Sequence, residues 1–199
     1  GLTVALNDVT IMGGSSTNHG GGISAMNTTT LSLTDAVIKN NEAASSSSKI
    51  FGGGVYVANF SRVTIQSSTI SDNHVTVTST SPSHFAKGGA LFVDYQSSIT
   101  IDDSVFADNS VTTSSTISFG GAICIKNSSS YEASFSMSDS TVSGNTLDAA
   151  GSVYHYGAGL SLSYVSTVSI SGSTFRSNEI ESAAGYASGA GLYVLSSDS

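Results

Sequence analysis

The stretch SVFADNSVTTSSTISFGGAICIK, residues 104–126, contains the two short motifs from which the rest of the chain is built. The first is apolar-x-x-Asn, here Phe106 to Asn109, and the second is a glycine-rich block, here Gly120 to Ile123. Six such blocks begin near Gly20, Gly52, Gly88, Gly120, Gly157 and Gly189. Their third residues fall at positions 22, 54, 90, 122, 159 and 191, so the period is 32 to 37 residues. Self-similarity at this period is typical of solenoids, propellers and arrays.

Two short stretches after each glycine block alternate apolar and polar residues, as strands with one buried face do. In the fourth repeat they run from Ile123 to Ile125 and from Phe135 to Met137. A third apolar residue stands three positions before each motif asparagine, and no stretch has a helical apolar period. Each period therefore predicts three strands. A variable loop follows, at 42–51, 74–87, 110–119, 146–156 or 179–188.

Three short strands cannot bury an apolar face alone, but successive triplets can bury it against one another. Stacking pairs each strand with its counterpart one coil away, about 4.8 Å along the axis. Parallel connections of this kind are overwhelmingly right-handed. We therefore predict an all-β fold, a single-stranded right-handed parallel β-helix (β-solenoid) of about six coils of 32 to 37 residues. Residues 1–199 would form one domain, uncapped at both ends.

The asparagine of the apolar-x-x-Asn motif recurs once per coil. In a stack, such a side chain can bond to backbone groups and to the asparagine of the next coil, as an amide ladder. The predicted ladder consists of Asn41, Asn73, Asn109, Asn145 and Asn178. Gly14 stands where an earlier asparagine would lie, so the ladder should begin at Asn41.

Two further columns carry aromatic residues. One lies shortly before the glycine blocks, and we expect it to anchor each loop on the body: Phe51, Phe85, Phe119, Tyr156 and Tyr186. The other is the outward side of the first strand: Ser24, Tyr56, Phe92, Cys124, Ser161 and Tyr193. We expect Tyr56, Phe92 and Tyr193 to form an exposed column that stacks on sugars or packs against a neighbouring filament. Ordinary strand propensity is the alternative explanation. Cys124 should be partly exposed.

Composition restricts the partners. The net charge is −8 and only six Lys and Arg residues are present, which argues against nucleic acid and anionic lipid. No apolar run approaches the ~20 residues of a membrane span, so membrane insertion is not expected. The single cysteine, Cys124, excludes an intrachain disulfide and a thiolate metal cluster. A Ser/Thr-rich, lysine-poor chain without an initiator methionine fits a processed, extracellular or cell-surface protein.

The paired motifs resemble the GGAI and FxxN repeats of the chlamydial polymorphic outer-membrane proteins. Gly120 to Ile123 and Phe106 to Asn109 match both motifs, as do Gly88 to Leu91 and Phe175 to Asn178. Similar repeats occur in large surface proteins of eukaryotic microbes. In the chlamydial family the repeats form the exported β-helical passenger of an autotransporter. The resemblance therefore implies this fold, an extracellular setting and a role in adhesion.

The chain begins and ends at different points of the repeat. Residues 4–8 align with the second strand at 31–35, and residues 192–194 form a first strand without its second. Open strand edges are templates for further pairing. We expect either a fragment of a longer solenoid or a subunit that stacks head to tail, with Val4, Leu6, Leu192 and Val194 at the assembly ends. Six coils predict a rise of roughly 29 Å per subunit.

Other candidate sites are weaker. Three N-x-Ser/Thr sequons, at Asn27, Asn59 and Asn127, share the turn after the first strand, where exposure would permit glycosylation, although chance alone can give this number. An aspartate column follows the second strand: Asp8, Asp35, Asp103 and Asp139. It suggests turn caps more strongly than catalysis or calcium binding. His19, His84 and His155 lie in alternate coils, too far apart for shared ligation. We expect no catalytic, metal or cofactor site.

Three functions remain open. The first is a non-enzymatic extracellular solenoid that forms or belongs to a surface filament and has further copies of itself as partners. The second is an adhesin-like passenger whose variable loops bind glycans or cells. The third is a polysaccharide lyase or hydrolase of the parallel β-helix type.

Overall fold

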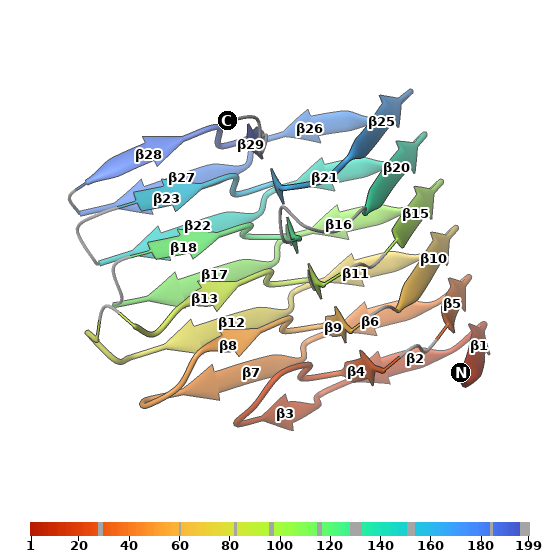
Figure 1. Ribbon diagram of the computed structural model, residues 1–199, viewed down its shortest axis with the longest axis horizontal. Helices are drawn as coiled ribbons and strands as arrows, with labels where there is room; N and C mark the ends of the chain where they lie inside the picture. The colour runs from red at the N-terminus through yellow and green to blue at the C-terminus, as the bar shows by residue number, and fades with distance from the viewer. Residues whose placement is uncertain are drawn as a thin grey trace.

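The computed structural model describes residues 1–27, 30–59, 61–81, 83–95, 98–114, 117–127, 133–150, 154–183 and 185–195. Within these ranges the chain forms 29 strands in five parallel sheets, and no helix. Between β1 and β25 it completes five full turns, and it then runs on through β29. Figure 1 shows the coils stacked in chain order, from red at the N-terminus to blue at the C-terminus.

Each sheet takes one strand from each coil. The first sheet contains β1 (Thr3–Asn7), β5 (Thr30–Thr34), β10 (Arg62–Gln66), β15 (Ser98–Asp102), β20 (Ser134–Ser138) and β25 (Thr167–Ser171). The second contains β2 (Thr10–Met12), β6 (Val37–Lys39), β11 (Thr69–Ser71), β16 (Val105–Ala107), β21 (Thr141–Ser143) and β26 (Thr174–Arg176). The third contains β3 (Ser15–Ser16), β7 (Glu42–Ser45), β12 (His74–Val77), β17 (Ser110–Thr113), β22 (Thr146–Ala149) and β27 (Glu179–Ser182).

The remaining two sheets flank the glycine blocks. The fourth sheet contains β8 (Ile50–Phe51), β13 (Ala86–Lys87), β18 (Ile117–Phe119), β23 (Tyr154–Tyr156) and β28 (Tyr186–Ser188). The fifth contains β4 (Ile23–Met26), β9 (Val55–Ala58), β14 (Leu91–Asp94), β19 (Ile123–Lys126), β24 (Leu160–Ser163) and β29 (Leu192–Leu195). All pairs are parallel and in register; Leu31, for example, lies between Val4 and Val63. The predicted all-β parallel solenoid is confirmed.

The prediction of three strands per coil was incomplete. The segments assigned to variable loops each contain two strands, such as β12 and β13 within 74–87. These strands have two to four residues, so each offers only one or two apolar side chains to an alternation pattern. They form because each pairs with its counterpart in the neighbouring coil. The sequence of a single coil therefore does not predict them.

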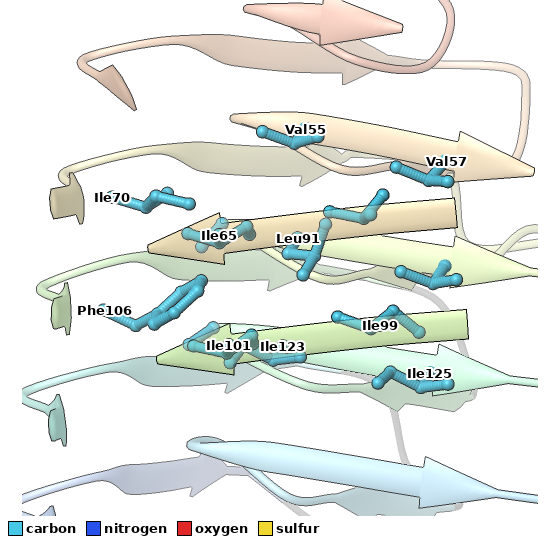
Figure 2. Close-up of a cluster of buried hydrophobic side chains, with 14 of the residues drawn as sticks. Val55, Val57, Ile65, Ile70, Leu91, Ile99, Ile101, Phe106, Ile123 and Ile125 are labelled. Carbon is cyan, nitrogen blue, oxygen red and sulfur yellow. The ribbon is translucent and has the colours of Figure 1, made fainter. Parts of the chain in front are cut away.

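Two interior clusters form the core. The larger one lies between the fifth, first and second sheets and includes Val57, Leu91, Ile101 and Phe106. Figure 2 shows these side chains pointing into the same interior from successive coils. The smaller one lies between the third and fourth sheets and includes Val75, Val111 and Leu147. Splitting the interior in this way gives the coil a bent cross-section.

The bend occurs at the glycine blocks. Gly52 has a φ of +68°, and a Cβ there would overlap the carbonyl oxygen of Val55. Only glycine adopts this left-handed turn without a side-chain clash. The equivalent first glycines of the other blocks also have positive φ. The third position is less restricted, because Ala90 and Ala122 occupy it in two coils.

The asparagine ladder is present as predicted. The Asn73 backbone N–H and Nδ2–H both donate to Asn109 Oδ1, each at 3.0 Å. Asn109 Nδ2 in turn donates to the carbonyls of Ile70 and Ala107 at 2.9 Å and to Asn145 Oδ1 at 3.0 Å. At the N-terminal end the Gly14 N–H donates to Asn41 Oδ1 at 2.9 Å, so the ladder begins at Asn41. The ladder satisfies backbone groups at a corner where the strands do not pair.

Replacing a central rung should therefore be costly. Asn109→Ala leaves the buried Asn73 N–H without an acceptor and the Ile70 and Ala107 carbonyls without this donor. We expect the free energy of unfolding to fall by about 3 kcal/mol or more, because each orphaned buried group costs about 1–3 kcal/mol. Chemical denaturation measures this change. Thr112→Ala, at an exposed position of the same coil, is the control and should change stability by less than about 0.5 kcal/mol.

Candidate functional site

The two end coils expose strand edges. Among the described residues, β1 pairs only with β5 and β25 only with β20, and the second, third and fifth sheets end in the same way. Val4 and Leu6 are half-buried against the core from one side. At the other end Leu192 and Val194 are exposed, Val194 by 55%. The four predicted assembly residues thus lie on strands that, among the described residues, have a pairing partner on one side only.

The predicted exposed aromatic column is wrong for two of its three members. Tyr56 and Phe92 are buried, and Tyr193 is half-buried. They do lie on the outer face of the fifth sheet, but the bend at the glycine block brings the fourth sheet against that face. Phe51 and Phe119 of the fourth sheet cover the column there. The outward side of a strand is exposed only where the coil is convex, and here it is concave.

We call this concave region the aromatic corner: it joins the outer faces of the fourth and fifth sheets. Its ring contacts run through the coils with centroid separations of 4.8 Å for His19–Phe51, 4.5 Å for Phe51–Phe92, 5.3 Å for Phe119–Tyr156 and 4.3 Å for Tyr156–Tyr193. Aromatic ring contacts at such distances are favourable beyond area burial, by about 0.5–1.5 kcal/mol per pair. The corner therefore holds the fourth sheet onto the body.

Aromatic residues do pack the segment before each glycine block onto the body, as expected, but not all of them share one register column. Phe51, Phe119 and Tyr156 occupy one register column, as predicted. The residue in that column of the third coil is Lys87. Tyr186 pairs instead with Tyr154, two residues away. The number of residues between the aromatic side chain and the glycine block differs by two from coil to coil. Which residue occupies the register column can therefore be decided only from the strand pairing.

Lys87 is an unexpected cation in this corner. Its side chain is 3% exposed. Its Nζ lies near four ring centroids: Phe119 at 4.8 Å, Phe85 at 5.4 Å, Phe51 at 5.7 Å and Phe92 at 6.0 Å. Burial is the main reason that the pKa of Lys87 is lowered to about 8; Lys126 acts in the same direction, while Cys124 and Asp94 oppose the change. The ring faces also attract the cation.

Cys124 is also inside the corner, which corrects the expectation of partial exposure. The thiol is buried, and burial raises its pKa to about 12. A protonated, inaccessible thiol is a poor nucleophile and a poor cross-linking partner. Its small side chain instead packs in one cluster with Phe92, against which Phe119 is packed.

A cluster of tyrosines at the C-terminal end of the corner was not recognised in the sequence. Tyr154 and Tyr156 project from β23, and Tyr154 stacks on Tyr186 at 5.8 Å. Tyr154 and Tyr186 are exposed by 40% and 72%. The signal was the pair of tyrosines spaced by two residues, which a strand places on one face.

The aspartate column consists of turn residues. Asp8, Asp35, Asp103 and Asp139 have φ between 45° and 53°, and Ser67 and Gly172 adopt the same conformation in their coils. Aspartate tolerates left-handed φ better than most residues, which explains its recurrence. Within the described ranges no group of three His, Cys, Asp or Glu side chains could hold a metal ion. The arrangement supports a structural role for these carboxylates.

His19, His84 and His155 also lie in separate surroundings. His19 stacks on Phe51, and its buried Nδ1 atom makes no hydrogen bond. His84 Nδ1 lies 2.7 Å from Ser79 Oγ, and the fully buried His155 Nδ1 lies 2.9 Å from Ser118 Oγ. Each histidine contacts its own coil or the adjacent one.

The sequons differ in accessibility. Asn27 is exposed and Asn59 is half-buried, and Asn59 Nδ2 donates to Asn27 Oδ1 at 3.2 Å. Asn127 is only 4% exposed, which contradicts the expectation of an exposed turn there. Residues 28–29, 60 and 128–129 of these sequons lie outside the described residues. The described part of the chain contains no helix with the length and apolarity of a membrane span.

Comparison with known proteins identifies the fold. A family model described as a right-handed beta helix region matches residues 1–158 and 52–199, which together cover the chain. No curated protein and no solved structure matches the chain. The match supports the β-helical part of the resemblance drawn from the GGAI and FxxN motifs, and it does not extend to the chlamydial proteins.

Lys87 makes stability depend on pH. Its folded-state pKa is below the unfolded value of 10.5, so between about pH 8 and 10.5 the unfolded state binds more protons and stability rises with pH. Lys87→Met removes this effect and should stabilise the protein most at low pH. We expect the difference in the free energy of unfolding between Lys87→Met and wild type to shrink by about 2 kcal/mol from pH ~7 to pH ~10. Denaturant titrations at both values measure it, with Lys49→Met as the exposed-lysine baseline. The same stability difference at both pH values would contradict the lowered pKa of Lys87.

Accessibility predicts the pattern of N-glycosylation in a eukaryotic secretory host. We expect glycans at Asn27 and Asn59 in folded, secreted protein and none at Asn127, because a glycan on a buried side chain is incompatible with the fold. Glycopeptide mass spectrometry of the secreted material tests each site separately. Efficient occupancy of Asn127 in folded protein would contradict the structure at this turn.

Proposed function

The chain belongs to the right-handed beta-helix family, and from this fold we propose that it is a structural, non-enzymatic extracellular protein that forms filaments by head-to-tail stacking. The contacting surfaces are the last coil, β25–β29, of one copy and the first coil, β1–β4, of the next. The observation that carries the proposal is the position-by-position match of their apolar columns.

If the register between coils is continued from the last coil of one copy to the first coil of the next, apolar residues face apolar residues. Val168 and Ile170 then lie beside Val4 and Leu6 of the next copy. The same extension gives three further apolar pairs: Phe175 with Ile11, Leu192 with Ile23, and Val194 with Ala25. Repeat proteins gain stability from such nearest-neighbour interfaces. A second copy can therefore continue the interior.

At two charged positions of the last coil, the register places no like charge opposite. By the same register, Arg176 lies opposite Met12 of the next copy and Glu179 opposite Ser15. The asparagine ladder does not continue, because Asn178 meets Gly14. Cohesion at the junction would come from strand pairing and apolar burial, at ~25 cal/mol per Å² of apolar surface.

The non-enzymatic assignment rests on the carboxylates and histidines. The aspartate column is accounted for by left-handed turns, and His19, His84 and His155 lie in separate coils. An inverting glycosidase needs two carboxylates facing each other across a cleft. The extracellular setting rests on the Ser/Thr-rich, lysine-poor composition.

An adhesin-like role is a second candidate, and one observation favours it. A hollow of about 600 Å³ lies where the variable loops of the first coils meet, lined by Thr17, Asn18, residues 44–48, Thr76 and Thr78. Hydroxyl groups of this kind can bond to a glycan. Binding by the monomer, rather than assembly, would distinguish this function, which the chlamydial resemblance also suggests.

Val194→Asp tests the stacking function. The side chain is exposed in a single copy, so the isolated fold should tolerate a carboxylate. In the stack this charge would be buried beside Ala25 of the next copy. We expect the critical concentration for assembly to rise at least about 100-fold, equivalent to about 3 kcal/mol. Sedimentation gives the critical concentration, and electron micrographs of wild type should give an axial repeat of about 29 Å.

The matched control is Thr100→Asp, which places the same charge on an exposed position of a middle coil. It should assemble like wild type apart from a small electrostatic effect. Wild type that stays monomeric up to about 1 mM, an apparent association energy weaker than about −4 kcal/mol, would refute the function. So would Val194→Asp filaments with wild-type critical concentration.

A further inference from the structure

The last two coils hold a stacked pair of exposed tyrosines. Tyr154 in β23 and Tyr186 in β28 are register partners on neighbouring strands. Their ring centroids are 5.8 Å apart and their planes differ by 15°. The same column contains Ile117 one coil earlier, so the pair is specific to these two coils. Both phenols reach solvent, where a small oxidant can reach them.

We propose that Tyr154 and Tyr186 are an oxidative cross-linking site that joins the last two coils through a dityrosine bond. The required co-reactants are hydrogen peroxide and a peroxidase. Each phenol loses one electron and one proton, which together reduce one peroxide to two waters. The two phenoxyl radicals then form one carbon–carbon bond at the ring positions ortho to oxygen. The two displaced ortho hydrogens return to the oxygens as protons, so both hydroxyls are restored and two hydrogen atoms are lost overall.

Geometry favours this pair over the other tyrosines of the aromatic corner. The parallel strands hold the two rings one coil apart with nearly parallel planes, so the radicals need no large movement to meet. Tyr56 is buried and its ring contacts those of His19, Phe51 and Phe92. Tyr156 and Tyr193 are closer, at 4.3 Å, but both are only partly exposed within the aromatic corner. Access therefore favours Tyr154 and Tyr186, whose exposed fractions are the largest of the cluster.

The bond would link residues 32 positions apart and tie two neighbouring coils together. A covalent bond between the two strands would oppose their separation when this part of the stack opens locally. Cys124 does not compete for the oxidant, because its thiol is buried. The site does not depend on stacking between copies.

Treatment of dilute protein with a haem peroxidase and limiting peroxide tests the proposal. We expect monomers that lack two hydrogen atoms, show dityrosine fluorescence and have a raised thermal midpoint. Trypsin cleaves after Arg176, and no Lys or Arg follows it. The cross-link should therefore join peptides 127–176 and 177–199, and fragmentation should place it between Tyr154 and Tyr186. Methionine oxidation at the exposed Met12 and Met26 adds oxygen and is counted separately.

Two conservative variants complete the test. Tyr186→Phe keeps the stacked ring but removes one phenol, and its intramolecular dityrosine should fall to background. Tyr193→Phe removes a phenol from the closer pair and should retain wild-type cross-linking. Circular dichroism establishes that both variants are folded. The proposal is overturned if the bond persists in Tyr186→Phe, if it maps to Tyr156 and Tyr193, or if covalent dimers are the only product.

Discussion

Parallel, in-register hydrogen bonding between successive coils is the interaction on which this structure depends. Once the backbone of one coil is paired with the next, each side chain lies about 4.8 Å from its equivalent. Apolar residues then form continuous columns such as Leu31 and Val63. Asparagines form a ladder whose side chains replace missing backbone partners. The same in-register pairing stacks the aromatic residues of the aromatic corner on the outer face. The apolar columns, the ladder and the aromatic corner therefore all result from one pattern of backbone hydrogen bonding.

The interior could be predicted from the sequence because two simple periods describe it. Alternation at every second residue identifies the inward side chains of the longer strands, and the fixed spacing from Ile70 to Asn73 identifies the ladder corner. The short strands were missed for a physical reason. Segments such as Ala86–Lys87 are too short to show alternation, and they are ordered by pairing with neighbours 32 to 36 residues away along the chain.

The outer surface was harder to predict, because alternation separates the two faces of a strand but does not say what covers the outer one. Phe92 looks like a surface residue by that rule, yet the bend at Gly88 places it under the fourth sheet. Lys87 is the clearest case. The sequence places Phe85 in the aromatic column before the glycine block. The strand register instead puts Lys87 at that position, among the rings. Only the pairing of whole strands decides between two positions that lie two residues apart.

The variable segment between the third and fourth strands has a genetic consequence. It absorbs length differences between coils, as the 12 residues between Asn73 and Ala86 compare with the eight between Asn41 and Ile50. Duplication or excision of one whole coil by unequal recombination therefore leaves each remaining neighbour in register, and it changes the rod by a step of about 4.8 Å. Rod length can therefore change while the parallel backbone pairing between neighbouring coils is retained.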